Sequence, residues 1–311
     1  LTGEIESGDA TRLEAQLKPL LVDGRIFSFY LDSPGGNLLE GMKLGRVIRK
    51  YGLTTYIGRY RGEGERSLPG NCYSACALTF LGGSYRFISD LSSYGVHRFY
   101  FDRAASSQDM DAAQILSAAI SNYIREMGVD QGLLDSMTVA GREEMNVLSA
   151  QKLKDLNVAN GGRLPAQWAI EVVKGGTYLR GEQTTIWGRG RAMFICGTRG
   201  IVMQSIAPVG DKAASMIQGK WVHSLLIGGD TVPIEAPPGM RADEGFLFSL
   251  IPLTTTQVRL IAKAKSIGQA IQISRDDPRY VGYSIDITQA DRERVGTYLM
   301  NCIADKQPTA R

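Results

Sequence analysis

The sequence lacks an apolar run long enough to cross a membrane as a helix. Such a helix needs about 18 consecutive apolar residues, whereas the longest runs here are strand-sized, as around Phe27 and Phe246. Neither sign of charge is in large excess, because 35 Lys and Arg stand against 32 Asp and Glu without a basic stripe. We therefore expect no membrane span and no nucleic-acid partner.

Cysteine is also scarce. The four cysteines form a close pair, Cys72 with Cys76, and a distant pair, Cys196 with Cys302. Neither pair has a second Cys-x-x-Cys or a nearby His at ligand spacing, so we predict no metal site. Each pair could form a disulfide in an oxidising compartment or remain as two buried thiols.

Length and composition indicate a globular chain of two domains. The sequence has 311 residues, 43% hydrophobic and 22% charged, and one domain takes roughly 150 residues. It starts at Leu1 in a strand-like segment, without Met or a charged and apolar leader. We expect that an upstream segment was removed, either a signal peptide or residues trimmed from the chain.

The first half alternates strands and helices. Residues 26–31 are apolar and end at a Ser-Pro-Gly-Gly turn, helical spacing follows over 38–50, and 53–57 reads as a second strand. Further helices are expected over 109–127 and 148–156. Alternation of this kind predicts a parallel sheet covered by helices. We assign residues 1–160 to an α/β domain.

The second half, residues 165–311, reads as a β-rich domain that follows a linker near 160–162. Thr288 is positioned to cap a final helix, whose apolar face includes Cys302 at helical spacing. We find no catalytic constellation here and assign the domain a binding or assembly role. The expected strands are 168–173, 184–187, 192–196, 201–205, 221–227, 245–252 and 270–274.

A candidate nucleophile and base occur in the first half. Ser74 stands at an expected helix start, and His97 closes a later strand. A serine hydroxyl needs an imidazole to take its proton, and His97 and His223 are the two histidines of the chain. Each feature alone is common, because a serine often caps a helix and a histidine is often structural. Together they indicate a Ser74–His97 pair.

The same site needs donors for an oxyanion. A glycine pair, Gly35-Gly36, follows the first buried strand and lets another backbone approach closely. A helix start offers unpaired N–H groups. We therefore predict that the N–H groups of Gly36 and Ala75 form the oxyanion site.

The ordered motifs resemble the Clp-peptidase superfamily, which includes crotonase-like relatives. Tyr30-Leu-Asp-Ser-Pro-Gly-Gly looks like its glycine-pair turn, Gly70-x-x-x-Ser74-Ala like its nucleophile turn, and Tyr94-Gly-Val-His97 like the strand that ends in its catalytic His. Leu148-Ser-Ala150 is similar to its short helix after the catalytic acid. The resemblance covers residues 1–160.

This resemblance implies a Clp/crotonase-like fold of repeated βαβ units and a serine peptidase that acts on polypeptide substrates without a cofactor. It also implies self-association through the helix expected over 109–127. The segment Cys72-Tyr-Ser-Ala-Cys76 is similar to an exported bacterial branch with cysteines beside the serine. That similarity favours a periplasmic or secreted protein.

The family's acid has no clear counterpart. A gapless reading places Met145 there, beside Glu143 and Glu144 and before Asn146. Glu144 would orient His97 after a shift of one residue, and Asn146 would do so as a neutral partner. We predict Glu144 as the third member.

Three other functions fit parts of the sequence. Lys43 or Lys50 would serve as the base of a Ser-Lys dyad, as in signal-peptide peptidases. An inactive Clp-like scaffold would bind an envelope partner through its β-rich domain. Acyl-CoA chemistry of the crotonase type is disfavoured, because those sites stabilise an enolate without a Ser–His pair.

Overall fold

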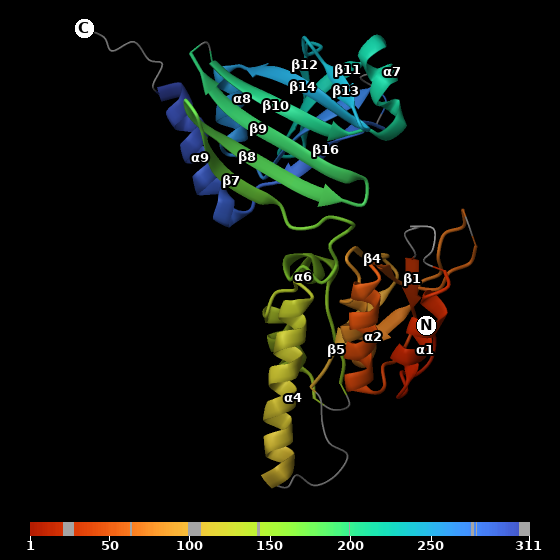
Figure 1. Cartoon of the computed structure of the whole chain (residues 1–311). Helices are drawn as coiled ribbons and strands as arrows, with labels where there is room; N and C mark the ends of the chain where they lie inside the picture. The colour runs from red at the N-terminus through yellow and green to blue at the C-terminus, as the bar shows by residue number, and fades with distance from the viewer. Residues whose placement is uncertain are drawn as a thin grey trace. The chain divides into compact units, whose positions relative to one another are not determined.

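The computed structural model describes residues 1–20, 28–62, 64–98, 107–141, 144–198, 200–274, 277 and 279–304 (Figure 1). The chain is mixed α/β, which confirms the broad fold class predicted from the sequence. It divides into two compact units, Leu1–Gly162 and Arg163–Arg311, which are described separately. In the described part of the chain, no helix has the length and apolarity that a membrane crossing requires.

Unit 1 contains six helices and six strands in the residues that the structure describes. Its helices are α1 (Asp9–Leu17), α2 (Leu38–Lys50), α3 (Ala75–Phe80), α4 (Ser107–Glu126), α5 (Gly132–Val139) and α6 (Ala150–Asp155). Its strands are β1 (Ser28–Leu31), β2 (Thr54–Ile57), β3 (Asn71–Tyr73), β4 (Arg86–Ile88), β5 (Ser93–Val96) and β6 (Asn146–Val147).

The expected parallel sheet is split into two small sheets. Strands β1, β2 and β4 form one parallel sheet, while β3 pairs parallel to β5, and β5 pairs antiparallel to β6. The split follows from the chain beyond β1, where Ser33 leaves β2 and bridges to Cys72. The Ser33 N–H donates to the Asn71 carbonyl at 2.7 Å, and Ser33 accepts from the Tyr73 N–H at 3.1 Å. The glycine turn therefore lies beside the strand that leads to Ser74.

Helix α2 packs closely against α3, the helix that starts after Ser74. Asn37 caps α2, because its side chain accepts from the Glu40 N–H at 3.0 Å. A Cβ on Gly41 would lie 2.5 Å from the Ala75 carbonyl oxygen, and one on Gly45 would overlap the Tyr123 hydroxyl. Gly41 therefore lets α2 pack against α3, and Gly45 leaves room for Tyr123 of α4.

Two arginines bind carbonyl groups where several segments of unit 1 meet. Arg86 is 2% exposed and donates to the carbonyl oxygens of Asn157 at 2.7 Å and Val158 at 2.8 Å. Arg86 and Arg49 share the Gly83 carbonyl, at 2.8 and 3.1 Å. Burial, and then the charge of Arg49, lower the pKa of Arg86 to about 10. Carbonyl dipoles stabilise this buried cation.

Unit 2 is built mainly of antiparallel strands. Its strands are β7 (Gln167–Val173), β8 (Gly176–Thr185), β9 (Gly188–Gly197), β10 (Gly200–Pro208), β11 (Val222–Ile227), β12 (Asp230–Ile234), β13 (Arg241–Asp243), β14 (Phe246–Leu253), β15 (Ser266–Gln272) and β16 (Val281–Asp286). Its helices are α7 (Ala213–Gln218), α8 (Thr255–Ile261) and α9 (Gln289–Ala304), with a 3-10 turn at Gly210–Lys212.

These strands form a six-stranded sheet, β13-β14-β10-β9-β8-β7, and a four-stranded sheet, β12-β11-β15-β16. The sheets share one hydrophobic core, to which both contribute alternate residues such as Phe194 and Ile267. A buried polar link crosses it: the Ser205 hydroxyl contacts Gln269 Oε1 at 2.6 Å and accepts from the Tyr283 hydroxyl at 2.9 Å. Unit 2 is therefore a two-sheet sandwich.

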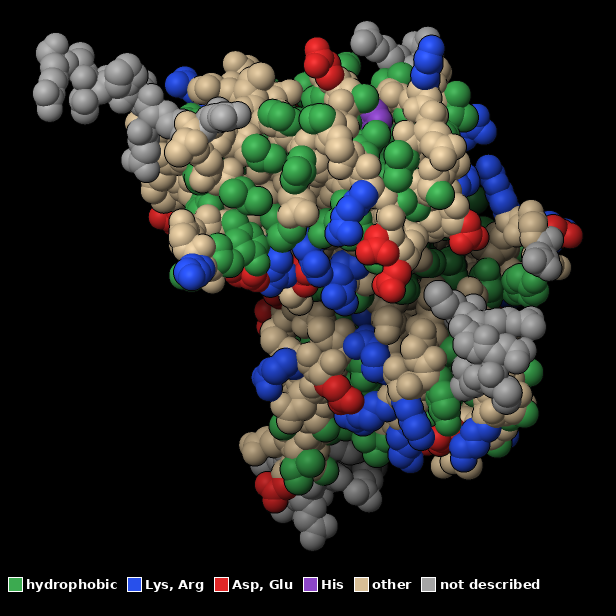
Figure 2. Space-filling view, turned by 45° about the horizontal axis from the view of Figure 1, so that its top comes forward, with side chains coloured by type: hydrophobic (Ala, Val, Ile, Leu, Met, Phe, Trp, Pro, Cys, Tyr) green, Lys and Arg blue, Asp and Glu red, His purple; other side chains and the backbone are tan. Residues whose placement is uncertain are grey.

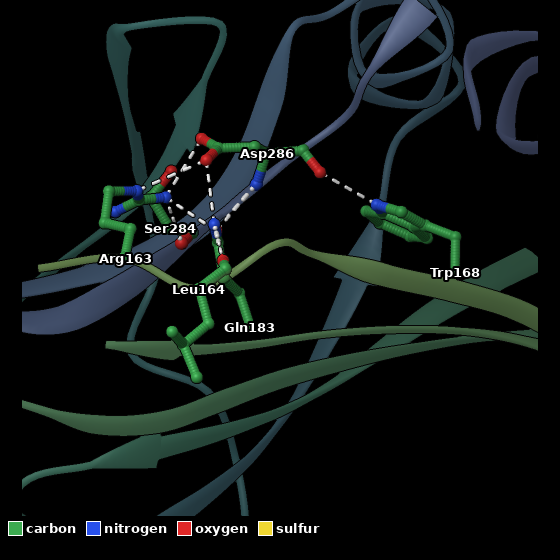
Figure 3. Close-up of polar contacts among 6 residues, drawn as sticks. All are labelled: Arg163, Leu164, Trp168, Gln183, Ser284 and Asp286. Carbon is green, nitrogen blue, oxygen red and sulfur yellow. Dashed lines mark hydrogen bonds and ion pairs between the residues drawn. The ribbon is translucent and has the colours of Figure 1, made fainter. Parts of the chain in front are cut away.

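A polar network fastens the start of unit 2 to both sheets (Figure 3). The Arg163 guanidinium contacts Gln183 Oε1 at 2.7 Å and Asp286 Oδ1 at 2.9 Å. Gln183 on β8 also donates to Asp286 Oδ2 at 2.8 Å, and the Trp168 indole donates to the Asp286 carbonyl at 2.9 Å. Gln183 and Asp286 come from different sheets, so this network joins the sheets at one end.

The predicted linker is held firmly on the unit 1 side. Asn160 Oδ1 accepts from the N–H groups of Arg86 at 2.9 Å and Gly162 at 3.2 Å. Its amide nitrogen donates to the Ser84 carbonyl at 2.9 Å. The chain therefore stays attached to unit 1 up to residue 162, the last residue before Arg163.

Helix α9 and strand β8 can be compared with the elements predicted from the sequence. The final helix has the predicted inward face, with Val295, Leu299 and Cys302 among its buried residues. The strand expected over 184–187 is wrong in its bounds, because β8 spans Gly176–Thr185. Gly181 weakens the strand pattern of β8, but it is required there, since a Cβ would lie 2.5 Å from the Trp168 ring.

Candidate functional site

The structure brings Ser74 and His97 within hydrogen-bonding distance. Ser74 follows β3 and precedes α3, and His97 directly follows β5. His97 Nε2 and Ser74 Oγ are 2.9 Å apart, within the range for a nucleophile and its base. Both side chains are half-buried, so the pair is held by the fold and still reached by solvent.

Ser74 occupies an unusual backbone conformation, with φ 53° and ψ −118°. A non-glycine residue in this region stores about 1–3 kcal/mol of strain and needs support from its surroundings. The Ser74 N–H donates to the Gly95 carbonyl at 3.0 Å, and the Ser74 carbonyl accepts from the Ala77 N–H at 3.0 Å. The side chain makes no cap bond to α3. The turn therefore directs the hydroxyl to His97 instead of to its own helix.

The predicted oxyanion residues surround this turn. A Cβ on Gly35 would lie 2.8 Å from Ser74 Cβ and 3.2 Å from the Ala75 nitrogen. On one edge, Ile5 pairs with the segment around Gly36, because its N–H donates to the Gly35 carbonyl at 2.7 Å. Neighbouring groups of an extended backbone point to opposite edges, so the Gly36 N–H faces the edge that Ile5 leaves open. The first N–H groups of a helix, here that of Ala75, have no partner within it.

A disulfide joins Cys72 on β3 to Cys76 in the first turn of α3. Their Cα atoms are 5.1 Å apart, and both residues are fully buried. Ser74 stands midway between them in the sequence. The disulfide therefore closes a short loop around the strained residue and connects the strand before it to the helix after it.

The predicted third member, Glu144, is exposed and lies two residues before β6, and its role stays a prediction. Glu143 lies outside the described residues. Met145 packs against β5, since a Cβ on Gly95 would lie 2.5 Å from Met145 Cγ. Asn146, on β6, donates its side-chain amide to the Ser136 carbonyl at 2.8 Å.

The two lysines considered as bases for a Ser-Lys dyad bind carboxylates. Lys43 Nζ lies 3.1 Å from Glu40 Oε2, and Lys50 Nζ lies 2.7 Å from Glu14 Oε1. Ser74 instead has His97 as its hydrogen-bond partner. The geometry favours imidazole over an amine as the base.

Sequence reasoning missed Gly95 as a functional position. Its carbonyl accepts from the Ser74 N–H, and its lack of a side chain leaves room for Tyr73 and Met145. A glycine inside a strand pattern, two residues before His97, was the available signal, because such glycines mark close backbone approach.

Unit 2 holds its own cysteine pair and histidine. A disulfide joins Cys196 on β9 to Cys302 on α9, so all four cysteines are oxidised. His223 is 2% exposed, and its Nδ1 has no hydrogen-bond partner among the residues that the structure describes. Burial lowers the pKa of His223. These features suit a packed structural residue and do not form a nucleophilic pair.

The Ser74–His97 pair therefore has the parts for nucleophilic attack: a hydroxyl, an imidazole that can remove its proton, and N–H groups nearby. Among the described residues, no cluster of His, Cys, Asp and Glu could hold a metal ion. Neither the protein-family models nor the curated proteins contain a match to this chain.

Proposed function

We propose that unit 1 is a Clp-type serine hydrolase that cleaves polypeptides, with Ser74 as nucleophile and His97 as general base. The observation that carries this proposal is the 2.9 Å contact between Ser74 Oγ and His97 Nε2, made by a serine in a strained turn. Strain concentrates at functional sites, and a purely structural capping serine would not need it. The parallel sheet β1-β2-β4, the parallel pair β3-β5 and the glycine turn support the finer Clp/crotonase-like assignment.

In the proposed reaction, His97 Nε2 accepts the proton of Ser74 as its oxygen attacks the scissile carbonyl. The oxyanion is bound by the N–H groups of Gly36 and Ala75. His97 then protonates the leaving amine, and water releases the acyl group from Ser74 by the same steps. Gly35 permits this arrangement, because any side chain there would collide with Ser74.

A polypeptide substrate would lie as an extended strand along residues 35–37. Ile5 occupies one edge of that segment through the Gly35 carbonyl and the Asn37 N–H, which donates to Ile5 at 2.8 Å. The opposite edge remains for main-chain pairing with a substrate. This arrangement would place the scissile carbonyl beside the Gly36 N–H.

We further propose a periplasmic or secreted location and self-association through α4. Oxidation of both cysteine pairs supports export, because disulfides persist in oxidising compartments. On α4, the apolar Ile115 is 72% exposed, which supports a role in assembly.

Labelling with a fluorophosphonate tests the proposal. The purified chain is treated with the probe and analysed by intact mass and peptide mapping. We expect one adduct on Ser74, which Ser74→Ala abolishes and His97→Ala slows at least about a hundredfold. Ser149→Ala, which removes an exposed capping serine of α6, is the matched control and should label as the parent does.

The alternative is an inactive Clp-like scaffold. The displaced acid motivates it, because a gapless reading places Met145 at the position of the family's acid. A parent protein that takes no label on Ser74 and cleaves no unfolded polypeptide would establish the scaffold and remove the peptidase. If the parent protein does label on Ser74, the variants Glu144→Gln and Asn146→Ala compare the two residues considered as partners of His97. Loss of labelling in one variant alone identifies the residue that orients His97.

A further inference from the structure

The segment after β1 changes its pairing partner within three residues. The Leu31 carbonyl accepts from the Gly58 N–H at 2.8 Å, which continues the pairing of β1 with β2. Two residues later, the Ser33 N–H donates to the Asn71 carbonyl at 2.7 Å, which begins the pairing with β3. Asp32 therefore lies where the chain passes from one sheet to the other.

This change of partner takes an acceptor away from the start of β3. If the parallel pairing of Ser33 continued, the Asn71 N–H would donate to the carbonyl of Leu31. That carbonyl instead accepts from Gly58. Asp32 Oδ1 accepts from the Asn71 N–H at 2.9 Å. The carboxylate thus takes the place of a main-chain carbonyl and extends the short bridge between Ser33 and β3.

Both sides of this bridge lead directly into the candidate site. On one side, the Ser33 hydroxyl accepts from the Gly35 N–H at 3.1 Å, so Ser33 shapes the glycine turn. On the other side, the Tyr73 N–H donates to the Ser33 carbonyl at 3.1 Å, and Ser74 is the next residue. A shift of the bridge therefore changes the distance between the Gly36 N–H and Ser74.

Asp32 is closely packed and uses both of its carboxylate oxygens. A Cβ on Gly70 would lie 3.1 Å from Asp32 Cβ and 2.8 Å from Gly58 Cα. The Asp32 side chain is 21% exposed, and its Oδ2 lies 3.0 Å from Arg59 Nε. One oxygen therefore binds β3, and the other binds the start of the loop after β2.

The contact with Asn71 should be the stronger of the two. The Arg59 side chain is 57% exposed, and exposed ion pairs change an equilibrium by about fivefold at most. Figure 2 shows basic and acidic side chains across the visible face, so an exposed pair is an ordinary feature of this chain. A hydrogen bond from a backbone N–H to a carboxylate is charge-assisted and about twice as strong as a neutral one.

We propose that Asp32 is a positioning residue of the candidate site, because its hydrogen bond to Asn71 holds the glycine turn in register with the turn at Ser74. This inference rests on the proposed function, in which the Gly36 N–H binds the oxyanion. Asp32 acts through Asn71 and Ser33, and not on the reacting atoms. Its removal should therefore slow the reaction of Ser74 in protein that remains folded.

Fluorophosphonate labelling of the full chain, at a temperature well below the melting temperature of each variant, tests this role. Asp32→Ala leaves the Asn71 N–H without its acceptor and should slow labelling of Ser74 about thirtyfold or more. Asp32→Asn keeps an oxygen that can accept from Asn71 and should restore the rate to within about fivefold of the parent. Arg59→Gln removes only the ion pair and should also stay within about fivefold.

Asp277→Ala in unit 2 is the matched control. Asp277 Oδ1 accepts from the Arg279 N–H at 3.0 Å, and the same carboxylate binds the Arg279 guanidinium. The substitution therefore removes the same two kinds of contact from the other unit, and it should leave the labelling rate unchanged. Thermal unfolding of every variant ensures that a loss of folded protein is not counted as slow labelling.

Hydrogen exchange followed by mass spectrometry examines the same contact without a reaction at Ser74. Asp32→Ala should speed exchange of the backbone over residues 70–74 at least about tenfold, because the Asn71 N–H is released. Asp32→Asn and Asp277→Ala should leave exchange over this segment as in the parent.

The outcomes separate this inference from the proposed function. A parent protein that takes no label on Ser74 overturns both. If the parent labels, three results overturn the positioning role alone. These are an Asp32→Ala rate within about fivefold of the parent, an Asp32→Asn rate as slow as that of Asp32→Ala, and slow labelling of Asp32→Ala with unchanged exchange over residues 70–74.

Discussion

Gly35 lies against Ser74 so closely that a methyl group on Gly35 would lie 2.8 Å from Ser74 Cβ. Gly35 follows β1 and Ser74 follows β3, strands of different sheets, and this close approach sets how the glycine turn lies against the nucleophile turn. The same methyl group would also lie 2.8 Å from the Tyr73 carbonyl. The glycine turn at Gly35 and the turn at Ser74 can therefore pack this closely only because residue 35 has no side chain.

Gly35→Ala should impair the site more than the fold. Displacement of Ser74 by the new methyl group is expected to slow fluorophosphonate labelling about a hundredfold, as small misplacements of reacting groups do. Gly52→Ala is the control, because Gly52 also has a positive φ, 64°, but has open space where Cβ would lie. Both variants should unfold at lower temperature because of backbone strain. Equal labelling rates for the two would contradict this account.

Removal of each disulfide should have a different effect, one mainly on the reactivity of Ser74 and the other mainly on the stability of the fold. The Cys72–Cys76 disulfide closes a short loop and should contribute about 2 kcal/mol, whereas Cys196–Cys302, with a sequence separation of 106, should contribute about 5 kcal/mol. We expect Cys72→Ala/Cys76→Ala to lower the labelling rate of Ser74 and Cys196→Ala/Cys302→Ala to lower mainly the melting temperature. Denaturant unfolding and labelling of both double variants measure this. The reverse pattern would show that the short disulfide does not position Ser74.

Stability should fall in acid because of His223. Burial lowers the pKa of His223 in the folded chain, so the unfolded chain binds the proton more readily. The folded state therefore keeps its full stability above the unfolded pKa of about 6.5 and loses up to about 1.4 kcal/mol per pH unit below it, until the folded pKa is reached. His223→Leu should flatten this dependence between pH 7 and 5 in thermal unfolding. If the melting temperatures of the parent and of His223→Leu fall equally between pH 7 and 5, His223 is not the cause of the loss of stability.

Arg86→Met should destabilise unit 1 by about 3 kcal/mol or more, because buried carbonyl groups lose their donors. Arg86→Lys should recover only part of this loss, since one ammonium cannot reach the separate carbonyls of Asn157 and Val158. Arg46→Met is the control, because the exposed Arg46–Glu126 pair contributes less than about 1 kcal/mol. Urea unfolding of the three variants gives the comparison.

The sequence located elements whose signals are local. Ser149 caps α6 through the Lys152 N–H, and Thr288 accepts from the Asp291 N–H before α9, as their positions in the sequence indicated. The order of Ser74 and His97 along the chain likewise predicted their proximity, because each ends or follows a parallel strand of the same sheet.

Features that depend on tertiary contacts could not be predicted from the sequence. The bounds of β8 depend on the fit of Gly181 beneath Trp168, which no local pattern reveals. The position of Glu144 depends on how Met145 packs against Gly95 and how Asn146 pairs across from Val96 on β5. A shift of one residue in such a segment turns a side chain to the opposite face. Sequence spacing therefore could not decide the third member.

The chain is held by hydrogen bonds on both sides of the peptide bond between Gly162 and Arg163. Asn160 holds Gly162 to unit 1, and Arg163 is bound within unit 2 by Gln183 and Asp286. A single peptide unit joins the two anchors, and Gly161 and Gly162 adopt positive φ values of 56° and 80°. Both positions therefore favour glycine, because residues with a side chain rarely adopt such φ values.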